Sequence, residues 1–125
     1  MIEVKTVLFL IIVHFLADFG LQTQNQATKK STSNLYLTYH VGTYALTWFF
    51  AMCGYNGSLL MALNFAIFTF SAHWVTDYVT SRISKKFFDN QDYHNGFVVI
   101  GFDQVLHYAQ LLLTYVILAK MSWPK

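Results

Sequence analysis

The sequence has few charged residues, one cysteine and one proline. Charged residues make up 11% of the chain of 125 residues, against roughly 25% in a typical soluble domain. Hydrophobic residues make up 55% and aromatic residues 18%, a balance that favours a protein lying in a lipid bilayer. The formal net charge is only +2, and the basic residues lie between the apolar runs, so we expect no nucleic-acid partner.

The scarcity of cysteine and proline excludes disulfides, thiolate-rich zinc sites and proline breaks within the apolar runs. Cys53 has no second cysteine to pair with, which excludes an intrachain disulfide and a thiolate-rich structural zinc site. Pro124 lies near the end of the chain, so no proline interrupts an apolar run.

The first apolar run follows Lys5, as the apolar region of a signal peptide follows a basic residue. However, this run contains His14 and Asp18 and ends without a small-x-small cleavage pattern. We therefore expect it to be a retained spanning helix.

Four apolar runs dominate the sequence. They cover residues 4–21, 35–53, 59–79 and 96–119, each close to the roughly 17–25 residues that span a bilayer. They predict an all-α, integral membrane four-helix bundle, forming one transmembrane domain over residues 1–125. Both termini then lie on one side of the membrane and the polar stretches 22–34 and 80–95 on the other.

The basic residues predict the orientation of this bundle. Five of them lie in the polar stretches: Lys29, Lys30, Arg82, Lys85 and Lys86. The side with the termini carries Lys5, Lys120 and Lys125. The positive-inside rule therefore predicts a multi-pass membrane protein with cytoplasmic loops and outward termini.

Histidine and aspartate recur inside the apolar runs at a spacing of four residues. The pairs are His14 and Asp18, His73 and Asp77, and Asp103 and His107, and the second run carries His40. Residues four apart share one face of a helix. All seven lie about one to two helical turns from the loop-side ends of their runs. A bundle can turn residues at one level inward to a common point.

This cluster predicts a metal site. The apolar runs contain no lysine or arginine at this level, so we expect the buried carboxylates to be neutralised by a bound cation. Imidazole and carboxylate ligands suit zinc, manganese or iron. All seven residues are candidate ligands, for either two divalent ions or one ion with the remaining residues orienting its ligands.

A mixed histidine–aspartate site that holds two ions typically hydrolyses phosphate esters. The sequence thus predicts a metal-dependent hydrolase acting on a lipid-linked or amphipathic phosphoester near the cytoplasmic leaflet. Water activated by the ion would be the nucleophile, and Asp103 or Asp18 the general base. His40 would be a ligand or stabilise the leaving oxygen. Gln22, Gln104 and Gln110 either orient ligands or bond helices together.

Other interpretations fit the same residues. Intramembrane aspartate and histidine also serve ion or proton transporters and channels, although here the polar residues occupy only one half of each run. A lone membrane histidine such as His40 more often bonds a neighbouring helix, and a pair four residues apart can bond to itself. A third hypothesis is a non-catalytic membrane protein that binds another membrane protein, with the metal as a structural staple. Membrane lipid is the expected partner, and a homo-oligomer stays open.

Three motifs carry a family resemblance: His14-Phe-Leu-Ala-Asp-Phe-Gly-Leu-Gln22, His73-Trp-Val-Thr-Asp77 and Asp103-Gln-Val-Leu-His107. The chain resembles a family of small polytopic membrane proteins of bacteria and phages that is known mainly as a domain of unknown function. The resemblance implies a location in the bacterial inner membrane, and under the third hypothesis a phage protein that binds a host membrane protein. More distantly, it is similar to inner-membrane proteins described as metal-dependent hydrolases. The resemblance implies a polar signature of His14, Asp18, Gln22, His40, His73, Asp77, Asp103, Gln104 and His107. It also implies a lysine about one turn after the third-run aspartate, where this sequence has Arg82 and Lys85.

Overall fold

The computed structural model describes all residues from 1 to 125, and it contains helices and no strand. The elements are α1 (Val4–Phe15), a π-helical turn η1 (Leu16–Gly20), α2 (Gln24–Lys29), α3 (Asn34–Asn56), α4 (Leu59–Asp89) and α5 (Tyr93–Ala119). The all-α prediction is confirmed. The short helix α2 and the π-helical turn are features that the hydrophobic pattern did not predict.

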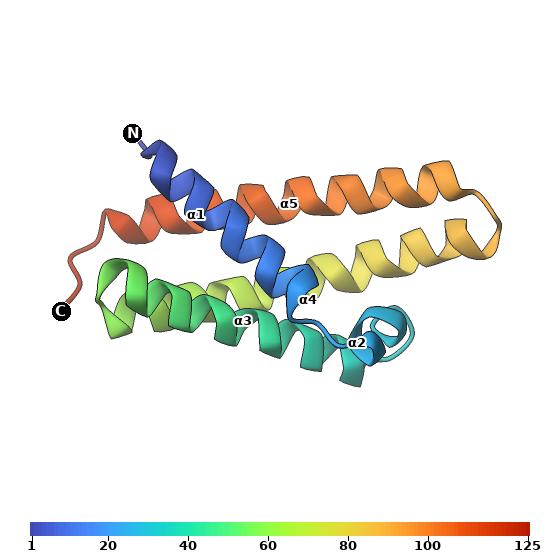
Figure 1. The fold of residues 1–125 in the computed structure, drawn as a ribbon, viewed down its shortest axis with the longest axis horizontal. Coiled ribbons are helices and arrows are strands. Elements are labelled where there is room, and N and C mark those ends of the chain that lie inside the picture. The colour runs from blue at the N-terminus through green and yellow to red at the C-terminus, as the bar shows by residue number, and fades with distance from the viewer.

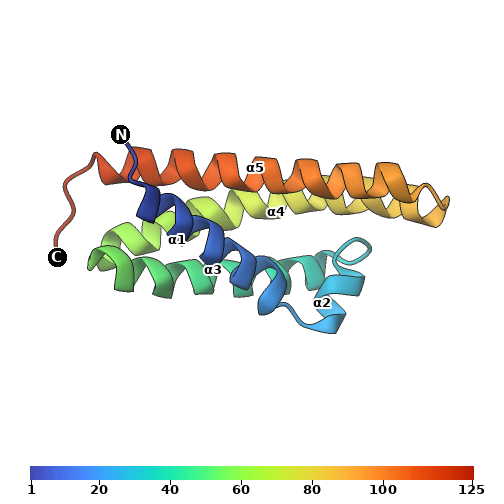
Figure 2. The ribbon, with the colours of Figure 1, turned by 45° about the horizontal axis from the view of Figure 1, so that its top comes forward.

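The long helices lie side by side, and α1 covers them. Helix α4 packs against both α3 and α5, while α1 contacts α3 and α5. Figure 1 and Figure 2 both show α1 crossing this layer obliquely. The two chain ends lie at one end of the molecule, and α2 lies toward the opposite end, where the turn between α4 and α5 also lies (Figure 1). The termini and the two polar stretches thus lie toward opposite ends of the molecule, and their placement on opposite sides of a membrane stays a prediction.

Capping side chains explain where three helices begin. The side chains of Ser33, Ser58 and Asp92 accept hydrogen bonds from backbone N–H groups in the first turns of α3, α4 and α5. Such caps satisfy donors that a helix start leaves unpaired. Helix α3 ends at Asn56 and is followed by Gly57, whose φ of 74° is a left-handed conformation that glycine adopts without a Cβ clash. This glycine allows the tight turn into α4.

The α4–α5 hairpin is longer than the apolar runs predicted. Residues 80–89 continue α4 and α5 begins at Tyr93, although the polar composition of residues 80–95 suggested a loop. Thr80 and Ser84 are buried, so the polar side chains of this extension partly face inward. A Cβ on Gly96 would lie 2.8 Å from the Phe88 ring, so the glycine permits close packing near the hairpin tip. Figure 2 shows the hairpin projecting beyond α3.

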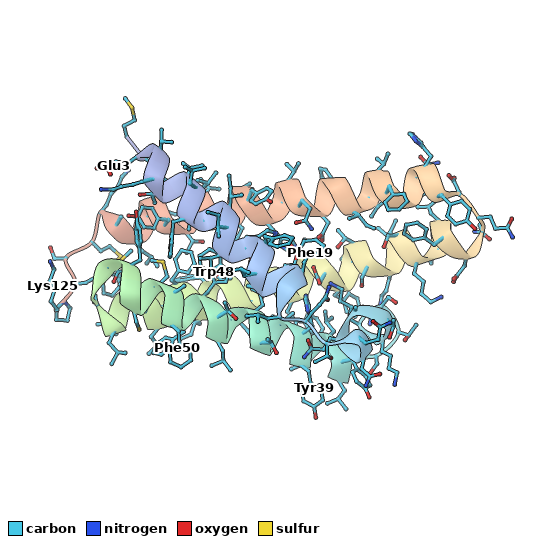
Figure 3. All side chains as sticks on the ribbon, in the orientation of Figure 1. Glu3, Phe19, Tyr39, Trp48, Phe50 and Lys125 are labelled. Carbon is cyan, nitrogen blue, oxygen red and sulfur yellow. The ribbon has the colours of Figure 1, made fainter.

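The core at the end with the termini is apolar. It contains Leu10, Trp48, Phe65 and Leu111, among others. In Figure 3 Trp48 points into the bundle, whereas Tyr39 and Phe50 point away from it on the outside of α3. Only 28 of the 125 residues are buried, and large apolar side chains remain exposed along all the long helices. The outer surface of this bundle is therefore largely apolar.

Two helices, α4 and α5, are long and apolar enough to cross a membrane. Helix α1 has only 12 residues before the π-helical turn. Helix α3 is long but carries Thr38, Thr43 and Thr47 as well as His40, which lowers its hydropathy. Length and composition thus support two of the four predicted spans.

Candidate metal centre

The seven histidine and aspartate residues meet inside the bundle. All of them are buried, and the most exposed, Asp103, retains 9% of its accessible surface. They come from every long element: α1 supplies His14, η1 Asp18, α3 His40, α4 His73 and Asp77, and α5 Asp103 and His107. The predicted convergence is confirmed. The shortest contacts run between helices, so the pairs do not simply bond to themselves.

Four of these residues place one donor atom each around a common centre. His40 Nε2 lies 3.2 Å from His73 Nε2, 3.0 Å from Asp18 Oδ1 and 3.3 Å from Asp77 Oδ2. His73 Nε2 lies 3.3 Å from Asp18 Oδ1 and 3.6 Å from Asp77 Oδ2. In a tetrahedral site with bonds of about 2.0–2.1 Å, donor atoms are about 3.3 Å apart. The five distances that involve the two histidine nitrogens are therefore close to those around a tetrahedral divalent ion, and all four donor atoms lie within 4.8 Å of one another.

The orientation of Asp18 is consistent with that use. Its Oδ1 atom is buried without a hydrogen bond, although His40 Nε2 is only 3.0 Å away. A buried carboxylate oxygen without a partner is strongly unfavourable. A cation bound between these atoms would satisfy it.

His107 lies against the donor group, and Asp103 lies against His107. His107 Nδ1 is 3.1 Å from His73 Nδ1, and His107 Nε2 is 3.0 Å from Asp77 Oδ1 and 3.2 Å from Asp103 Oδ2. Partners on the far ring nitrogen fix the tautomer and orientation of a ligand histidine. Asp18, Asp103 and His107 also form a second group that could hold an ion. The two arrangements predicted from the sequence, one ion or two, thus both have a geometric counterpart.

His14 belongs to neither donor group. Its Nδ1 atom lies 2.8 Å from the Tyr44 hydroxyl, and its Nε2 atom lies 2.7 Å from Gln104 Oε1. Asp18 Oδ2 is 3.6 Å away, beyond hydrogen-bond distance. Both nitrogens of His14 therefore have polar partners, and its predicted role as a ligand stays a prediction.

Lys30 corrects one expectation. We expected no lysine or arginine from the apolar runs to pair with the carboxylates, but Lys30, from the polar stretch after the first run, reaches them: its ammonium lies 2.8 Å from Asp77 Oδ2 and 3.3 Å from His40 Nε2. Burial opposes its charge, but Asp77, Asp18 and Asp103 outweigh this effect and raise the pKa of Lys30 above its ordinary value. The carboxylates thus have a positive partner supplied by the loop after α2, which the composition of the apolar runs could not show.

A cavity of about 330 Å³ opens beside the cluster, on the side of the molecule where α2 lies. The carboxylates of Asp18, Asp77 and Asp103 line it. Its wall also carries two lysines, four hydroxyl groups and several apolar groups. These include Lys30, Lys85, Ser31, Thr80, Ser81, Ser84, Phe19, Phe88 and Ile100. The cluster is therefore accessible to a molecule that has both polar and apolar parts.

The three glutamines and Tyr44 have different surroundings. Gln104 bonds His14 and donates to Asp103 Oδ2 at 3.0 Å, so it orients members of the cluster. Gln22 lines the cavity. Gln110 donates to Thr69 on α4 and joins two helices instead. Tyr44, which the sequence did not single out, stacks on His73 with ring centroids 3.9 Å apart.

The comparison with protein families identifies a group of relatives. The family model described as Protein of unknown function (DUF3307) matches residues 6–124. The chain belongs to this family. No curated protein and no solved structure matches it. Membership in the DUF3307 family confirms the resemblance to a family of unknown function, while the likeness to hydrolases stays a prediction.

Proposed function

We propose that this DUF3307 protein is a multi-pass protein of the bacterial inner membrane that hydrolyses a lipid-linked or amphipathic phosphoester with a bound divalent ion. The observation that carries the proposal is the group of four donor atoms beside a polar cavity, in which the two histidine nitrogens lie 3.0–3.6 Å from each other and from the two carboxylate oxygens. Tetrahedral spacing favours zinc over manganese, which prefers six oxygen-rich ligands.

The outer surface supports the membrane location. Exposed apolar side chains follow α3, α4 and α5 over much of their length, including Phe50, Phe68, Val105 and Ile117. Apolar surface of this extent is unusual for a soluble monomer and suits contact with lipid. The cavity lies on the side of the basic loops, which corresponds to the cytoplasmic leaflet in the predicted orientation.

The proposed reaction needs a bound ion, a general base and ligands for the ion. A bound ion would supply an activated water molecule and stabilise negative charge on the phosphate. Asp103 lines the cavity but lies outside the group of four donors, so it is the best-placed general base. Water oxygen bonds to phosphorus, the ester P–O bond breaks, and the proton taken by Asp103 passes to the leaving alcohol oxygen. Asp18 and His40, the other predicted catalytic residues, would serve as ligands.

The cavity wall suggests the substrate class. Lys30 and Lys85 offer positive charge to a phosphate, while Phe19, Phe88 and Ile100 offer apolar contact. A molecule that combines an anionic phosphate with an apolar group would match both parts. Lipid-linked phosphoesters have this character and would reach the cavity from the surrounding membrane.

The test starts with the purified full-length chain in detergent. Elemental analysis should find zinc in the native protein and in His94→Gln, because His94 is exposed and lies away from the cluster. His73→Gln should lose the ion. Release of phosphate from a phosphatidic acid substrate should stop on chelation and return with added zinc.

Two outcomes would count against the proposal. Equal zinc content in His73→Gln and the native protein would overturn the metal centre. Stoichiometric zinc without chelator-sensitive turnover across phosphomonoester and phosphodiester lipids would favour the structural staple.

A further inference from the structure

Lys30 contacts two of the four proposed ligands. Its Nζ atom lies 2.8 Å from Asp77 Oδ2 and 3.3 Å from His40 Nε2. An ion bound to the donor group would use the same two atoms. A divalent ion and an ammonium group repel one another at such distances, particularly where little water screens them. Lys30 and the ion therefore compete for Asp77.

The backbone of Lys30 is held, whereas its side chain is long. Helix α2 begins with a capping box between Thr23 and Gln26, and Gln26 also donates to Thr43 on α3. The backbone N–H of Lys30 donates to Gln26 O at 3.1 Å. The flexible stem of a lysine can carry its ammonium to a new partner while the backbone stays in place.

The same cavity has groups suited to an anion. Ser81 Oγ is buried without a hydrogen bond and lines the cavity together with Lys30 and Lys85. Lys85 is already paired with Asp89 at 2.6 Å and 2.8 Å. Of the two lysines that line the cavity, Lys30 is therefore the one that would lose its carboxylate partner if an ion bound to the donor group.

We propose that Lys30 is an internal cation that holds Asp77 while no ion is bound and transfers to a phosphate group in the cavity when an ion takes Asp77. The inference rests on the proposed function and adds to it a coupling between the binding of the ion and the binding of phosphate. Ion and phosphate bind cooperatively, because the phosphate stabilises the displaced ammonium and the ammonium no longer opposes the ion. The ligand class is a phosphate or phosphate monoester.

The test compares two neighbouring lysines. Lys30→Gln removes the competing charge, whereas Lys29→Gln removes a charge that lies over the Tyr36 ring, away from the donor group. Zinc affinity is measured on the full chain in detergent by competition with a chelating dye, with and without inorganic phosphate. Without phosphate, Lys30→Gln should bind zinc about tenfold more tightly than the native chain, and Lys29→Gln should match the native chain.

Added phosphate should have the larger effect on the native chain and the smaller effect on Lys30→Gln. Phosphate should tighten zinc binding about tenfold in the native chain and in Lys29→Gln, and less than about twofold in Lys30→Gln. Lys30→Arg keeps the charge and should retain much of the coupling. Lys30→Met, which keeps part of the apolar stem, replaces Lys30→Gln if the latter aggregates.

A lipid arm identifies the source of the phosphate. Micelles with phosphatidic acid are compared with micelles of phosphatidylcholine at equal lipid content. If only phosphatidic acid tightens zinc binding, the cavity binds the phosphate of a lipid headgroup. If inorganic phosphate also tightens zinc binding, the cavity recognises the phosphate group itself.

The failures are distinguishable. Unchanged or weaker zinc binding in Lys30→Gln would overturn the competition but leave the metal centre standing. Tighter binding with full phosphate coupling would overturn the transfer to phosphate. Absence of zinc from all variants would overturn the proposed function and this inference together.

Discussion

Individual residues in the cluster have distinct surroundings despite their similar spacing in the sequence. Asp18, His40, His73 and Asp77 direct donor atoms to one centre. His107 contacts His73 and Asp77, and Asp103 contacts His107. His14 contacts Tyr44 and Gln104. The same residue types thus divide into proposed ligands and residues that orient them, and substitutions should separate the two roles.

Asp103→Asn tests the proposed base. The amide keeps the shape of the side chain but cannot take a proton, so phosphate release should fall by about 10²–10⁴-fold. Zinc content should stay at one ion per chain. Asp92→Asn is the control, since Asp92 is remote from the cluster and asparagine caps a helix equally well. Loss of one of two ions in Asp103→Asn would instead assign the second group, Asp18, Asp103 and His107, to an ion.

Tyr44→Phe tests the support of His14. The substitution removes the 2.8 Å hydrogen bond and leaves a buried ring nitrogen unpaired, while the stacking on His73 is retained. The free energy of unfolding should fall by about 1–3 kcal/mol. Denaturant titration in mixed micelles measures it, with Tyr39→Phe on the exposed face of α3 as the control. Equal stability of the two variants would contradict the role of this hydrogen bond.

Two short elements position the site. The π-helical turn η1 is closed by the bond from Leu21 N–H to Leu16 O and carries Asp18. A wider turn changes the angle between Asp18 and His14, and such turns often occur at functional sites. Helix α2 then places Lys30 beside Asp77. Neither element contributes much to the core, but both decide which charges meet.

Thr23→Ala tests how α2 is held. Loss of the N-cap should destabilise the short helix by about 0.5–2 kcal/mol. Cleavage by trypsin after Lys29 or Lys30 should therefore be about two to thirty times faster, if cleavage follows local opening. Thr28→Ala provides the control, because Thr28 lies within the same helix and its hydroxyl bonds only Gln24 O. Equal cleavage rates in the two variants would show that the capping box does not hold α2.

The molecule as a whole is asymmetric along its long axis. The half with the termini has a packed apolar core, and the other half contains the charged cluster and the cavity. Figure 3 places Glu3 and Lys125 at the end with the termini. This arrangement suits a site that is reached from one side of a membrane.

Single cysteines test the four-span arrangement. In a Cys53→Ser background, a cysteine replacing Lys125 should react with a membrane-impermeant maleimide added to spheroplasts. A cysteine replacing Asn90, in the turn after α4, should react only after permeabilisation. Reaction of both from outside would contradict the arrangement, and the reverse pattern would contradict only the orientation.

Flux measurements test the transport hypothesis. Proteoliposomes should show zinc and proton entry at the rate of protein-free liposomes, because the packed core around Trp48 and Phe65 offers no polar path. Empty liposomes and Asp77→Asn proteoliposomes serve as controls. Flux above that of both controls would favour a transporter.

The level and inward direction of the cluster could be predicted from the sequence alone. Helix periodicity places residues four apart on one face, and burying a charge without a partner is strongly unfavourable. Residues such as His73, Asp77, Asp103 and His107 at matched distances from the loops were therefore expected to meet. The apolar runs likewise predicted the all-α class, since their length and uninterrupted character are local properties.

Only the tertiary structure decided which side chains of the cluster contact one another. Lys30 reaches Asp77 across 47 positions of sequence, and His14 meets Gln104 across 90. The extension of α4 through residues 80–89 depends on packing against α5, and the orientation of Asp18 depends on a π-helical turn. These features arise from the approach of distant segments, and a local pattern of hydrophobic and polar residues carries no information about that approach.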